Sequence, residues 1–297
     1  MRRRLLVALQ AVVALVFLVS FSQSACPAQI EDVEFLSHGV RLSGSLVLPD
    51  GGHPLAALVL VHGAGPENRM SGLARGLASD RFAVLTYDKR GVGKSGGEYW
   101  GTEPNKENVA PVNLSLLADD AVAAAQALAK HPGLEAVPVG FVGISQAGWI
   151  IPIAATRYPV TKFIALWSGP VCTVSEQLHF QFLAMNDQDF WKTHTKAQVA
   201  EYMKSVRYRP DDTDPRTSLT KISIPGFWLF GDQDNVIPID FSVARLDGLI
   251  QQGHTNFQYA VVAGYGHTLD GITFNAPPYA TMVAWIKETV SRLPRSR

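Results

Sequence analysis

Short runs of hydrophobic residues recur along the chain, and each one ends in glycine or polar residues. The runs are LAALVLVHG, FAVLTYD, VPVGFVGIS, FIALWSG, IPGFWLFGD and NFQYAVVAG. Continuous hydrophobic runs of this length are typical of strands that are covered on both faces. Segments with helical character separate them, including NLSLLADDAVAAAQALAKHP and PPYATMVAWIKETVSRL. This alternation predicts an α/β fold with a mostly parallel, doubly wound sheet.

Two stretches depart from this rhythm. Residues 33–48 alternate hydrophobic and polar positions on either side of His38-Gly39, which predicts an antiparallel hairpin at one edge of the sheet. Residues 171–218 carry aromatic side chains on polar, helix-like sequence, which predicts an inserted helical cap within the same domain. We expect these aromatic rings mainly to pack the cap, and three of them are candidates for an apolar wall beside a substrate. The aromatic residues of the cap are Phe180, Phe182, Phe190, Trp191, Tyr202 and Tyr208, and the three candidates are Phe182, Phe190 and Trp191.

The first 28 residues have the pattern of a secretory signal peptide. Three arginines precede the hydrophobic run LLVALQAVVALVFLVSF, and small polar residues follow it. We therefore expect an exported protein, periplasmic or secreted, whose mature part is one domain over residues 29–297. A retained N-terminal anchor and a lipoprotein signal ending at Cys26 are the alternatives.

Charge and cysteine content exclude several classes of function. The chain has 297 residues with 26 basic and 26 acidic side chains, so its formal net charge is zero and nothing favours binding to nucleic acid or to an acidic membrane. Two cysteines provide neither a disulfide framework nor a cysteine-based metal site, and the scattered histidines show no metal-binding spacing. The stretch YDKRGVGKSGG resembles a P-loop, but Asp88 stands where that motif needs glycine. We expect no metal and no cofactor.

The octapeptide VGISQAGW places one serine among small residues directly after a predicted strand. A tight turn from strand to helix brings the residues two before and two after its apex close together, and Gly143 and Ala147 are small enough for this. Gly148 allows the following helix to pack closely. Ser145 at the apex has an exposed hydroxyl in such a turn, and the Gln146 N–H lies at a helix N-terminus, where it can bind an oxyanion. The pattern predicts a nucleophilic serine, whereas a plain helix N-cap is the alternative.

Three further stretches support the nucleophile. The sequence LVLVHGAGP ends a strand in a loop whose N–H groups can complete an oxyanion hole. The acids Asp232 and Asp234 follow a later strand, and His267 follows the last one. Serine, acid and histidine therefore occur in this order, each after a predicted strand.

With these motifs, the chain resembles the α/β-hydrolases from Val33 to its C-terminus. The motifs that carry the resemblance are HGAGP, YDKRGVGKS, GISQAG, GDQDNVIP and GYGHTL. Within that superfamily the chain is most similar to bacterial dienelactone-hydrolase-like and prolyl-oligopeptidase-like serine hydrolases. The resemblance implies an α/β-hydrolase fold and the hydrolysis of a carboxylic ester through an acyl-enzyme. Cleavage of a short peptide or amide, acyl transfer, and a hydrolase fold used only for binding are the alternatives.

The resemblance also assigns roles to individual residues. Ser145 is implied to attack the acyl carbon, and His267 to accept its proton and pass it to the leaving group. The N–H groups of Ala64 and Gln146 are the implied oxyanion donors. The family pattern Gly-x-x-Asp-x-x-Val/Ile-Pro falls on Asp234, so this residue and not Asp232 is implied to orient the histidine.

Other polar residues near these motifs are expected to be structural. His62 precedes the HGAGP loop, so we interpret it as a structural residue. Asp88 and Arg90 are expected to hold the glycine-rich loop through local pairing.

Overall fold

A computed structural model describes residues 29–101, 106–185, 187–207, 209, 211–268 and 276–294. The predicted signal peptide over residues 1–28, together with Cys26 and the cap residue Tyr208, lies outside the described residues. None of the helices within these ranges has the length and hydropathy that a membrane crossing requires.

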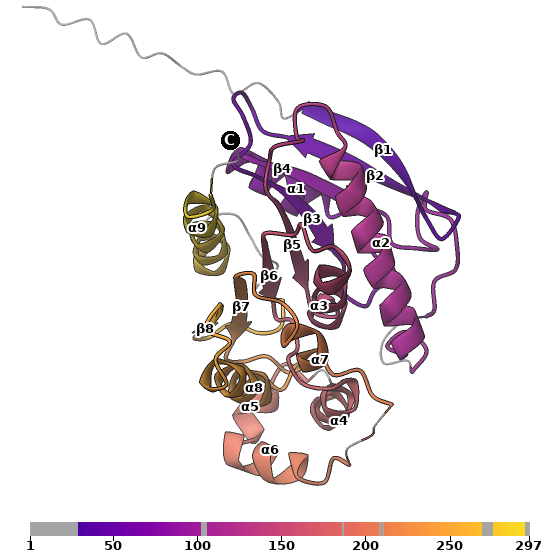
Figure 1. Ribbon diagram of the computed structural model, residues 1–297. Helices are drawn as coiled ribbons and strands as arrows, with labels where there is room; N and C mark the ends of the chain where they lie inside the picture. The colour runs from indigo at the N-terminus through magenta and orange to yellow at the C-terminus, as the bar shows by residue number, and fades with distance from the viewer. Residues whose placement is uncertain are drawn as a thin grey trace, which may run out of the picture.

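The described strands form a single eight-stranded sheet in the order β1-β2-β4-β3-β5-β6-β7-β8. The pairs β1–β2 and β2–β4 are antiparallel, and the remaining pairs are parallel (Figure 1). The strands are β1 (Gln29–Ser37), β2 (Val40–Leu48), β3 (Ala56–Val61), β4 (Phe82–Tyr87), β5 (Val139–Ile144), β6 (Phe163–Trp167), β7 (Gly226–Gly231) and β8 (Phe257–Val262). This is the α/β-hydrolase fold that the sequence predicts.

The predicted hairpin at the edge of the sheet is confirmed. Strands β1 and β2 are joined by His38 and Gly39, which have φ angles of 49° and 74°. Two consecutive residues with positive φ are typical of the two-residue turns whose twist matches that of the flanking strands. Glycine adopts this conformation without strain, which explains its place in the turn.

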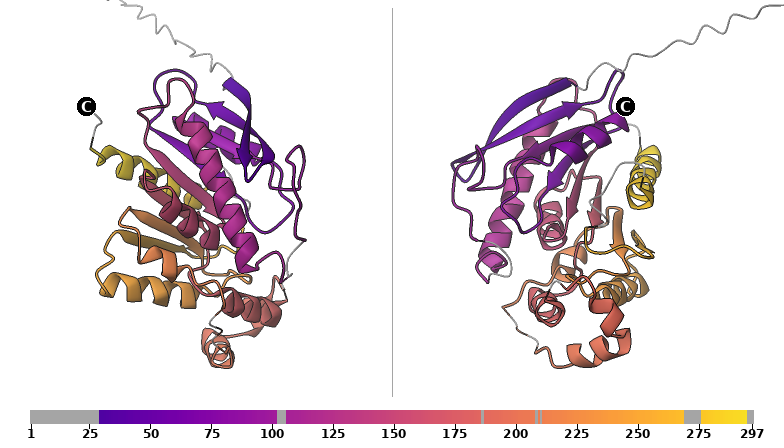
Figure 2. Two further views of the ribbon diagram at one scale, coloured as in Figure 1. Left: turned by 45° about the vertical axis from the view of Figure 1, so that its right-hand side comes forward. Right: turned by 180° about the vertical axis from the view of Figure 1, so that it is seen from behind.

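Helices cover both faces of the sheet and give the protein two core layers. Helices α2 and α3 pack on one face, and α1 and α9 pack on the other (Figures 1 and 2). In β3, Val59 faces the first layer while Leu58 and Leu60 face the second. Both faces of β3 are therefore buried, which is why its sequence is continuously hydrophobic. The helices outside the 171–218 segment are α1 (Ser71–Ser79), α2 (Pro111–Ala129), α3 (Ala147–Arg157), α8 (Ile239–Gln251) and α9 (Pro277–Ser291).

Among the described residues, four helices lie between β6 and β7, in the segment predicted as a cap. They are α4 (Val174–Ala184), α5 (Phe190–Thr193), α6 (Lys196–Met203) and α7 (Arg216–Leu219). Thr173 begins α4 with a capping box, in which its hydroxyl accepts from the N–H of Glu176 and the Glu176 carboxylate accepts from the N–H of Thr173. Thr195 begins α6 in the same way.

The cap has a small hydrophobic core of its own. The core consists of Phe180, Ala184, Phe190, Val199 and Met203. Phe190 is only 1% exposed, so this ring packs inside the cap. Phe182 is 56% exposed, and Trp191 packs at the margin of the cluster. The three candidate wall residues thus occupy three different environments.

Candidate active site

Ser145 lies at the apex of the turn between β5 and α3. Its φ angle is 55°, a left-handed conformation that residues with a side chain rarely adopt. Such strain costs on the order of 1–3 kcal/mol and persists only where the surrounding packing holds it. The Ser145 N–H donates to the carbonyl of Trp167 on β6 at 3.0 Å, which ties the turn to the neighbouring strand. The turn therefore holds the hydroxyl at the carboxyl edge of the sheet.

The small residues around Ser145 are required by close packing. A Cβ atom added to Gly143 would lie 2.5 Å from the Cβ of Ala147 and 2.9 Å from the carbonyl oxygen of Val61. A Cβ added to Gly148 would lie 2.5 Å from the ring of Pro170. Carbon atoms cannot approach this closely without a shift of the backbone. The turn and the start of α3 fit their surroundings only with glycine at both positions.

Ser145, His267 and Asp234 form a continuous chain of hydrogen bonds. The Ser145 Oγ is 2.9 Å from His267 Nε2, and the other ring nitrogen, Nδ1, is 2.9 Å from Asp234 Oδ2. The three residues follow β5, β7 and β8, strands that are parallel and end at the same edge of the sheet. The His267 side chain is 15% exposed and the Asp234 side chain is fully buried. The hydroxyl group thus has an imidazole beside it, and that imidazole has a buried carboxylate behind it.

The two acids of the β7 loop have different partners. The second oxygen of Asp234 accepts hydrogen bonds from the N–H groups of Val236 and Ile237, both at 2.8 Å. Asp232 instead accepts from the N–H of Gly264 at 2.7 Å, in the loop that leads to His267. Asp232 therefore fixes the backbone of that loop, while Asp234 contacts the histidine ring.

Two side chains donate hydrogen bonds to the backbone of Asp234 and His267. The Trp191 indole N–H of the cap donates to the Asp234 carbonyl at 2.9 Å, and the Ser168 hydroxyl donates to the His267 carbonyl at 2.8 Å. Trp191 thus contacts the loop that carries the acid, a role that the sequence did not indicate.

The candidate oxyanion donors lie on either side of the serine. Gln146 follows Ser145 directly and is the N-cap residue of α3, and Ala64 lies in the loop after β3. Both residues are buried. A Cβ atom added to Gly63 would lie 3.6 Å from the Cβ of Ser145, so the loop that carries Ala64 is in contact with the serine. Within the described part of the chain, no hydrogen bond from the N–H of Ala64 or Gln146 is seen.

Buried ionisable residues surround the loop that carries Ala64. Burial lowers the pKa of His62 to about 3, so the ring is neutral and its Nε2–H donates to the carbonyl of Tyr87. Burial raises the pKa of the Glu67 carboxyl, which accepts from the N–H of Gly63 at 3.2 Å. The Lys89 ammonium contacts the carbonyl of Gly63 from the other side at 2.7 Å. His62 is outside the serine–histidine–aspartate chain and packs against Tyr87, as expected for a structural residue.

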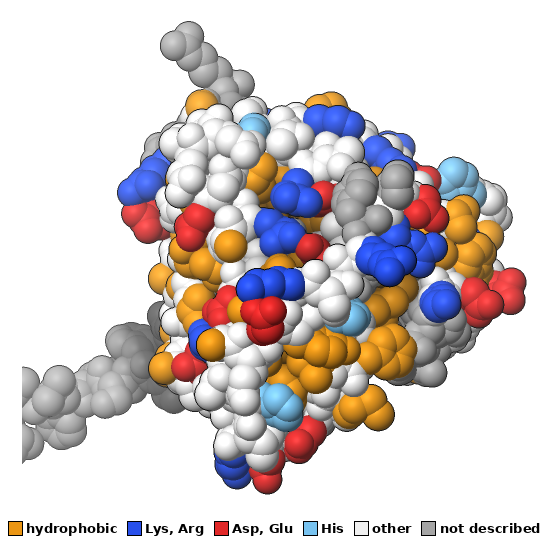
Figure 3. Space-filling view, turned by 90° about the horizontal axis from the view of Figure 1, so that it is seen from below, with side chains coloured by type: hydrophobic (Ala, Val, Ile, Leu, Met, Phe, Trp, Pro, Cys, Tyr) orange, Lys and Arg blue, Asp and Glu red, His pale blue; other side chains and the backbone are white. Residues whose placement is uncertain are grey.

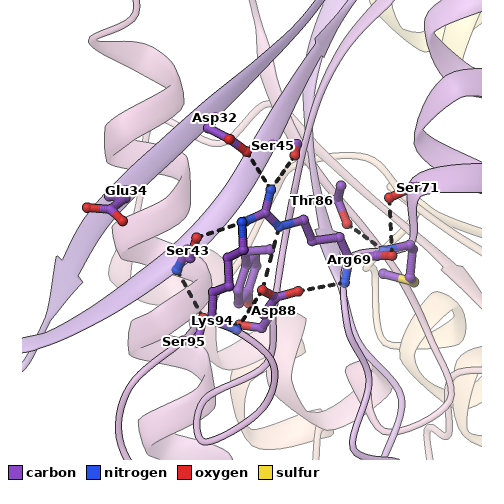
Figure 4. Close-up of polar contacts among 12 residues, drawn as sticks. Asp32, Glu34, Ser43, Ser45, Arg69, Ser71, Thr86, Asp88, Lys94 and Ser95 are labelled. Atoms are coloured by element: carbon purple, nitrogen blue, oxygen red, sulfur yellow. Dashed lines mark hydrogen bonds and ion pairs between the residues drawn. The ribbon is translucent and has the colours of Figure 1, made fainter.

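Arg69 fastens the far end of the same loop to the sheet, as Figure 4 shows. Its guanidinium donates to the hydroxyls of Ser43 and Ser45 on β2 and pairs with Asp32 on β1. The Arg69 N–H donates to one oxygen of Asp88 at 3.1 Å. The loop is therefore held to β1, β2 and the end of β4.

Asp88 holds the glycine-rich loop after β4 as expected, whereas Arg90 does not. Asp88 accepts from the N–H of Lys94 at 3.0 Å, a local contact within the loop. Arg90 was also expected to pair locally, but its guanidinium pairs with the fully buried Asp120 of α2. That expectation was wrong because the topology lays α2 beside this loop, which brings a carboxylate thirty residues away within reach.

The cap contributes an apolar hollow next to the β7 loop. Its lining includes Phe180, Trp191 and Val199 from the cap and Pro238 and Phe241 from the start of α8. Figure 3 views the molecule from the cap side and shows hydrophobic side chains gathered on this face, with lysine and arginine side chains beside them. Three charged residues, Lys196, Asp232 and Asp240, also line the hollow.

The described side chains that could bind a metal ion are not clustered. Among the residues that the structure describes, no three His, Cys, Asp or Glu side chains are grouped in a way that could hold a metal ion. Cys172 is buried and unpaired with another cysteine, and burial raises the pKa of its thiol.

The fold is that of an α/β-hydrolase. Residues 52–217 match the family described as serine aminopeptidase, S33, and the chain belongs to this family of hydrolases. A curated relative is the esterase EstD of Thermotoga maritima, which is 23% identical over 236 residues, or 70% of this chain. The chain matches only about half (53%) of the length of that relative.

Several solved structures share the fold at low sequence identity. A Pyrococcus furiosus esterase aligns with a TM-score of 0.62 and 16% identity, covering 89% of this chain and 91% of its own. A Pyrococcus horikoshii acylaminoacyl peptidase aligns with a TM-score of 0.64 and 17% identity, covering 92% of this chain and 43% of its own. A dienelactone hydrolase of Anabaena variabilis aligns with a TM-score of 0.56 and 18% identity, covering 91% of this chain and all of its own. These likenesses show that the chain has the α/β-hydrolase fold.

Proposed function

We propose that the protein is a serine hydrolase that cleaves a carboxylic ester through an acyl-enzyme. The observation that carries the proposal is the hydrogen-bonded chain from Ser145 through His267 to Asp234, with both links at 2.9 Å. In this proposal Ser145 is the nucleophile, His267 the general base and Asp234 the residue that orients the imidazole. Ala64 and Gln146 supply the N–H groups that bind the oxyanion.

The acylation step follows from this geometry. The Ser145 oxygen attacks the ester carbonyl carbon while His267 Nε2 takes its proton, and the carbonyl oxygen becomes an oxyanion. Asp234 accepts from Nδ1–H, so Nε2 is left unprotonated and ready to act as the base. Collapse of the tetrahedral intermediate breaks the bond to the alcohol oxygen, which receives the proton from Nε2.

Deacylation repeats the sequence with water. His267 removes a proton from a water molecule, whose oxygen attacks the acyl carbon, and the Ser145 oxygen leaves with that proton. Asp234 stays ionised throughout and stabilises the imidazolium that forms twice in each cycle. Two N–H groups of the loop that carries Asp234 and the ring of His267 together satisfy this buried carboxylate.

The substrate class is proposed from the relatives. The esterases of Thermotoga maritima and Pyrococcus furiosus and the dienelactone hydrolase support an ester of a small carboxylic acid. Cleavage of a peptide or amide is the second candidate, because the family is described as serine aminopeptidase and one structural neighbour is an acylaminoacyl peptidase. Both substrates use the same residues, and they differ in the leaving group.

Activity-based labelling tests the nucleophile directly. A fluorophosphonate is expected to modify Ser145, which peptide mass spectrometry identifies. Ser145→Ala should abolish both labelling and hydrolysis, whereas Ser71→Ala, at the exposed start of α1, should change neither. A panel of p-nitrophenyl esters and aminoacyl arylamides then separates the two substrate classes. Label on another serine, or undiminished turnover by Ser145→Ala, contradicts the proposal.

A further inference from the structure

Lys89 is a buried cation directly beneath the loop that carries Ala64. The residue is 2% exposed, and its ammonium lies 2.7 Å from the carbonyl oxygen of Gly63, 3.1 Å from that of Ala64 and 3.4 Å from that of Gly65. A buried ammonium is costly unless acceptors surround its three N–H groups. Three consecutive carbonyl groups of one loop therefore turn toward a single charge.

The contact with Gly63 fixes the direction of the next N–H group. In a trans peptide the C=O and N–H bonds point in opposite directions. Because the Gly63 carbonyl points at Lys89, the N–H of Ala64 in the same peptide unit points away from it. Gly63 itself lies against Ser145, because a Cβ atom added to Gly63 would be only 3.6 Å from the Cβ of the serine. The ammonium thus determines where one of the two proposed oxyanion donors is aimed.

The same ammonium also contacts the residue that carries the second proposed donor. Lys89 Nζ donates to the side-chain Oε1 of Gln146 at 3.0 Å, and the amide group of Gln146 donates to the carbonyl of Asn108 at 3.2 Å. The Asn108 side chain in turn donates to the carbonyl of Ala64 at 3.1 Å. Lys89, Gln146, Asn108 and Ala64 therefore form a closed ring of hydrogen bonds, which joins the two sides of the site.

We propose that Lys89 is the positioning residue of the oxyanion hole, and that its charge also strengthens the hole. A cation bound to the Gly63 carbonyl polarises that peptide, which makes the Ala64 N–H a better donor. In a site of low dielectric, a fixed positive charge one peptide unit behind an oxyanion also stabilises it directly. This inference rests on the proposed function, since an oxyanion forms only if Ser145 attacks a carbonyl or a phosphonate.

The test compares binding of a transition-state analogue with binding of a ground-state ligand. Lys89→Met removes the charge and the donors while keeping a similar length. We expect kcat on p-nitrophenyl acetate to fall by about ten- to a hundredfold, below the ~10²–10³ seen when a donor itself is removed, with KM within about threefold of wild type. The inhibition constant of a trifluoromethyl ketone, which forms an oxyanion on Ser145, should rise by the same factor as kcat/KM falls.

Two variants and one control separate positioning from folding. Lys89→Arg keeps the charge and should recover at least part of the loss. Gln146→Met keeps its backbone N–H but breaks the ring of hydrogen bonds. This variant should bind the ketone more weakly and have a melting temperature close to that of wild type. Lys94→Met, an exposed lysine of the same glycine-rich loop, is the matched control and should behave as wild type.

The outcomes distinguish this inference from the proposed function. Wild-type kcat and ketone inhibition in a folded Lys89→Met overturn the positioning role. So does a loss of activity that only follows the loss of folded protein, with ketone binding by the folded fraction unchanged. If Lys89→Met does not fold, unchanged ketone inhibition in Gln146→Met overturns the role. Absence of fluorophosphonate labelling at Ser145 in the wild-type protein refutes the proposed function itself, whatever the Lys89 variants do.

Discussion

The substitution Asp234→Asn should abolish most of the activity while leaving the fold largely intact. The amide oxygen of the substituted side chain can still accept from the N–H groups of Val236 and Ile237, but its NH₂ group replaces the carboxylate oxygen that faces His267 Nδ1. An NH₂ group donates, so Nδ1 must become the acceptor and the ring proton moves to Nε2. Nε2–H then faces the hydroxyl of Ser145 and cannot take its proton. Loss of the correct tautomer costs about 10⁴ in kcat in serine hydrolases with this arrangement.

The cost in stability follows from the same contacts. Two hydrogen bonds to a charged acceptor become bonds to a neutral one, a loss of roughly 1–2 kcal/mol in total. In a domain of this size, that corresponds to a fall of about 2–6 °C in the melting temperature. Asp234→Ala is the harsher variant, because it leaves two N–H groups without an acceptor at about 1–3 kcal/mol each.

The assay pairs Asp234→Asn with Asp232→Asn, which sits in the same loop and bonds to the Gly264 N–H. Steady-state hydrolysis of p-nitrophenyl acetate and thermal melts are measured for both. We expect Asp232→Asn to retain activity within about tenfold of wild type, since it alters loop support and not the ring. Equal losses in the two variants, or a larger loss in Asp232→Asn, would refute the assignment of the acid.

Three more predictions follow from single contacts. Gly148→Ala should lower the free energy of unfolding in urea by about 1–3 kcal/mol, because the Cβ of the alanine would lie 2.5 Å from the Pro170 ring. An unchanged free energy of unfolding would mean that α3 can shift to make room. Trp191→Phe removes the hydrogen bond to Asp234 while keeping a smaller aromatic ring, so kcat should fall while the preference among ester chain lengths stays unchanged. An altered preference with the kcat of wild type would assign the ring to the substrate wall. His62 has a pKa of about 3 in the folded protein against 6.5 when unfolded, so its neutral form contributes stability that is complete above about pH 6.5 and lost as the pH falls toward 3. Between pH 6.5 and 4.5, the free energy of unfolding of the wild-type protein, measured in urea, should fall by on the order of 2 kcal/mol more than that of His62→Gln. The same pH dependence in both proteins would contradict this.

Export remains a proposal that rests on residues 1–28. We expect N-terminal sequencing of protein from the producing cell to find a chain cleaved between Ser22 and Ala28. A chain that begins at Met1 supports an anchor instead, and a lipid on Cys26 supports a lipoprotein.

Much of the fold could be predicted from the sequence because burial on two faces leaves a simple pattern. A strand between two helix layers needs hydrophobic residues at nearly every position, and β3 and β6 have them throughout. The hairpin was evident from alternation around His38-Gly39, and the turn at Ser145 from small residues that the packing requires. These signals are local, so a linear sequence carries them.

The contacts between distant segments could be decided only by the tertiary structure. In the sequence, Asp232 and Asp234 lie in one loop and only the pattern of the resembled family distinguishes them, whereas the approach of the β8 loop gives them different partners. The sequence assigned no role to Lys89 in its glycine-rich stretch, yet its ammonium reaches the loop after β3 and the side chain of Gln146. Which side chain an ammonium or a carboxylate meets depends on how the parallel strands bring their loops to one edge. Hydrogen bonds act over about 3 Å in space regardless of separation along the chain, and hydrophobic periodicity contains no record of them.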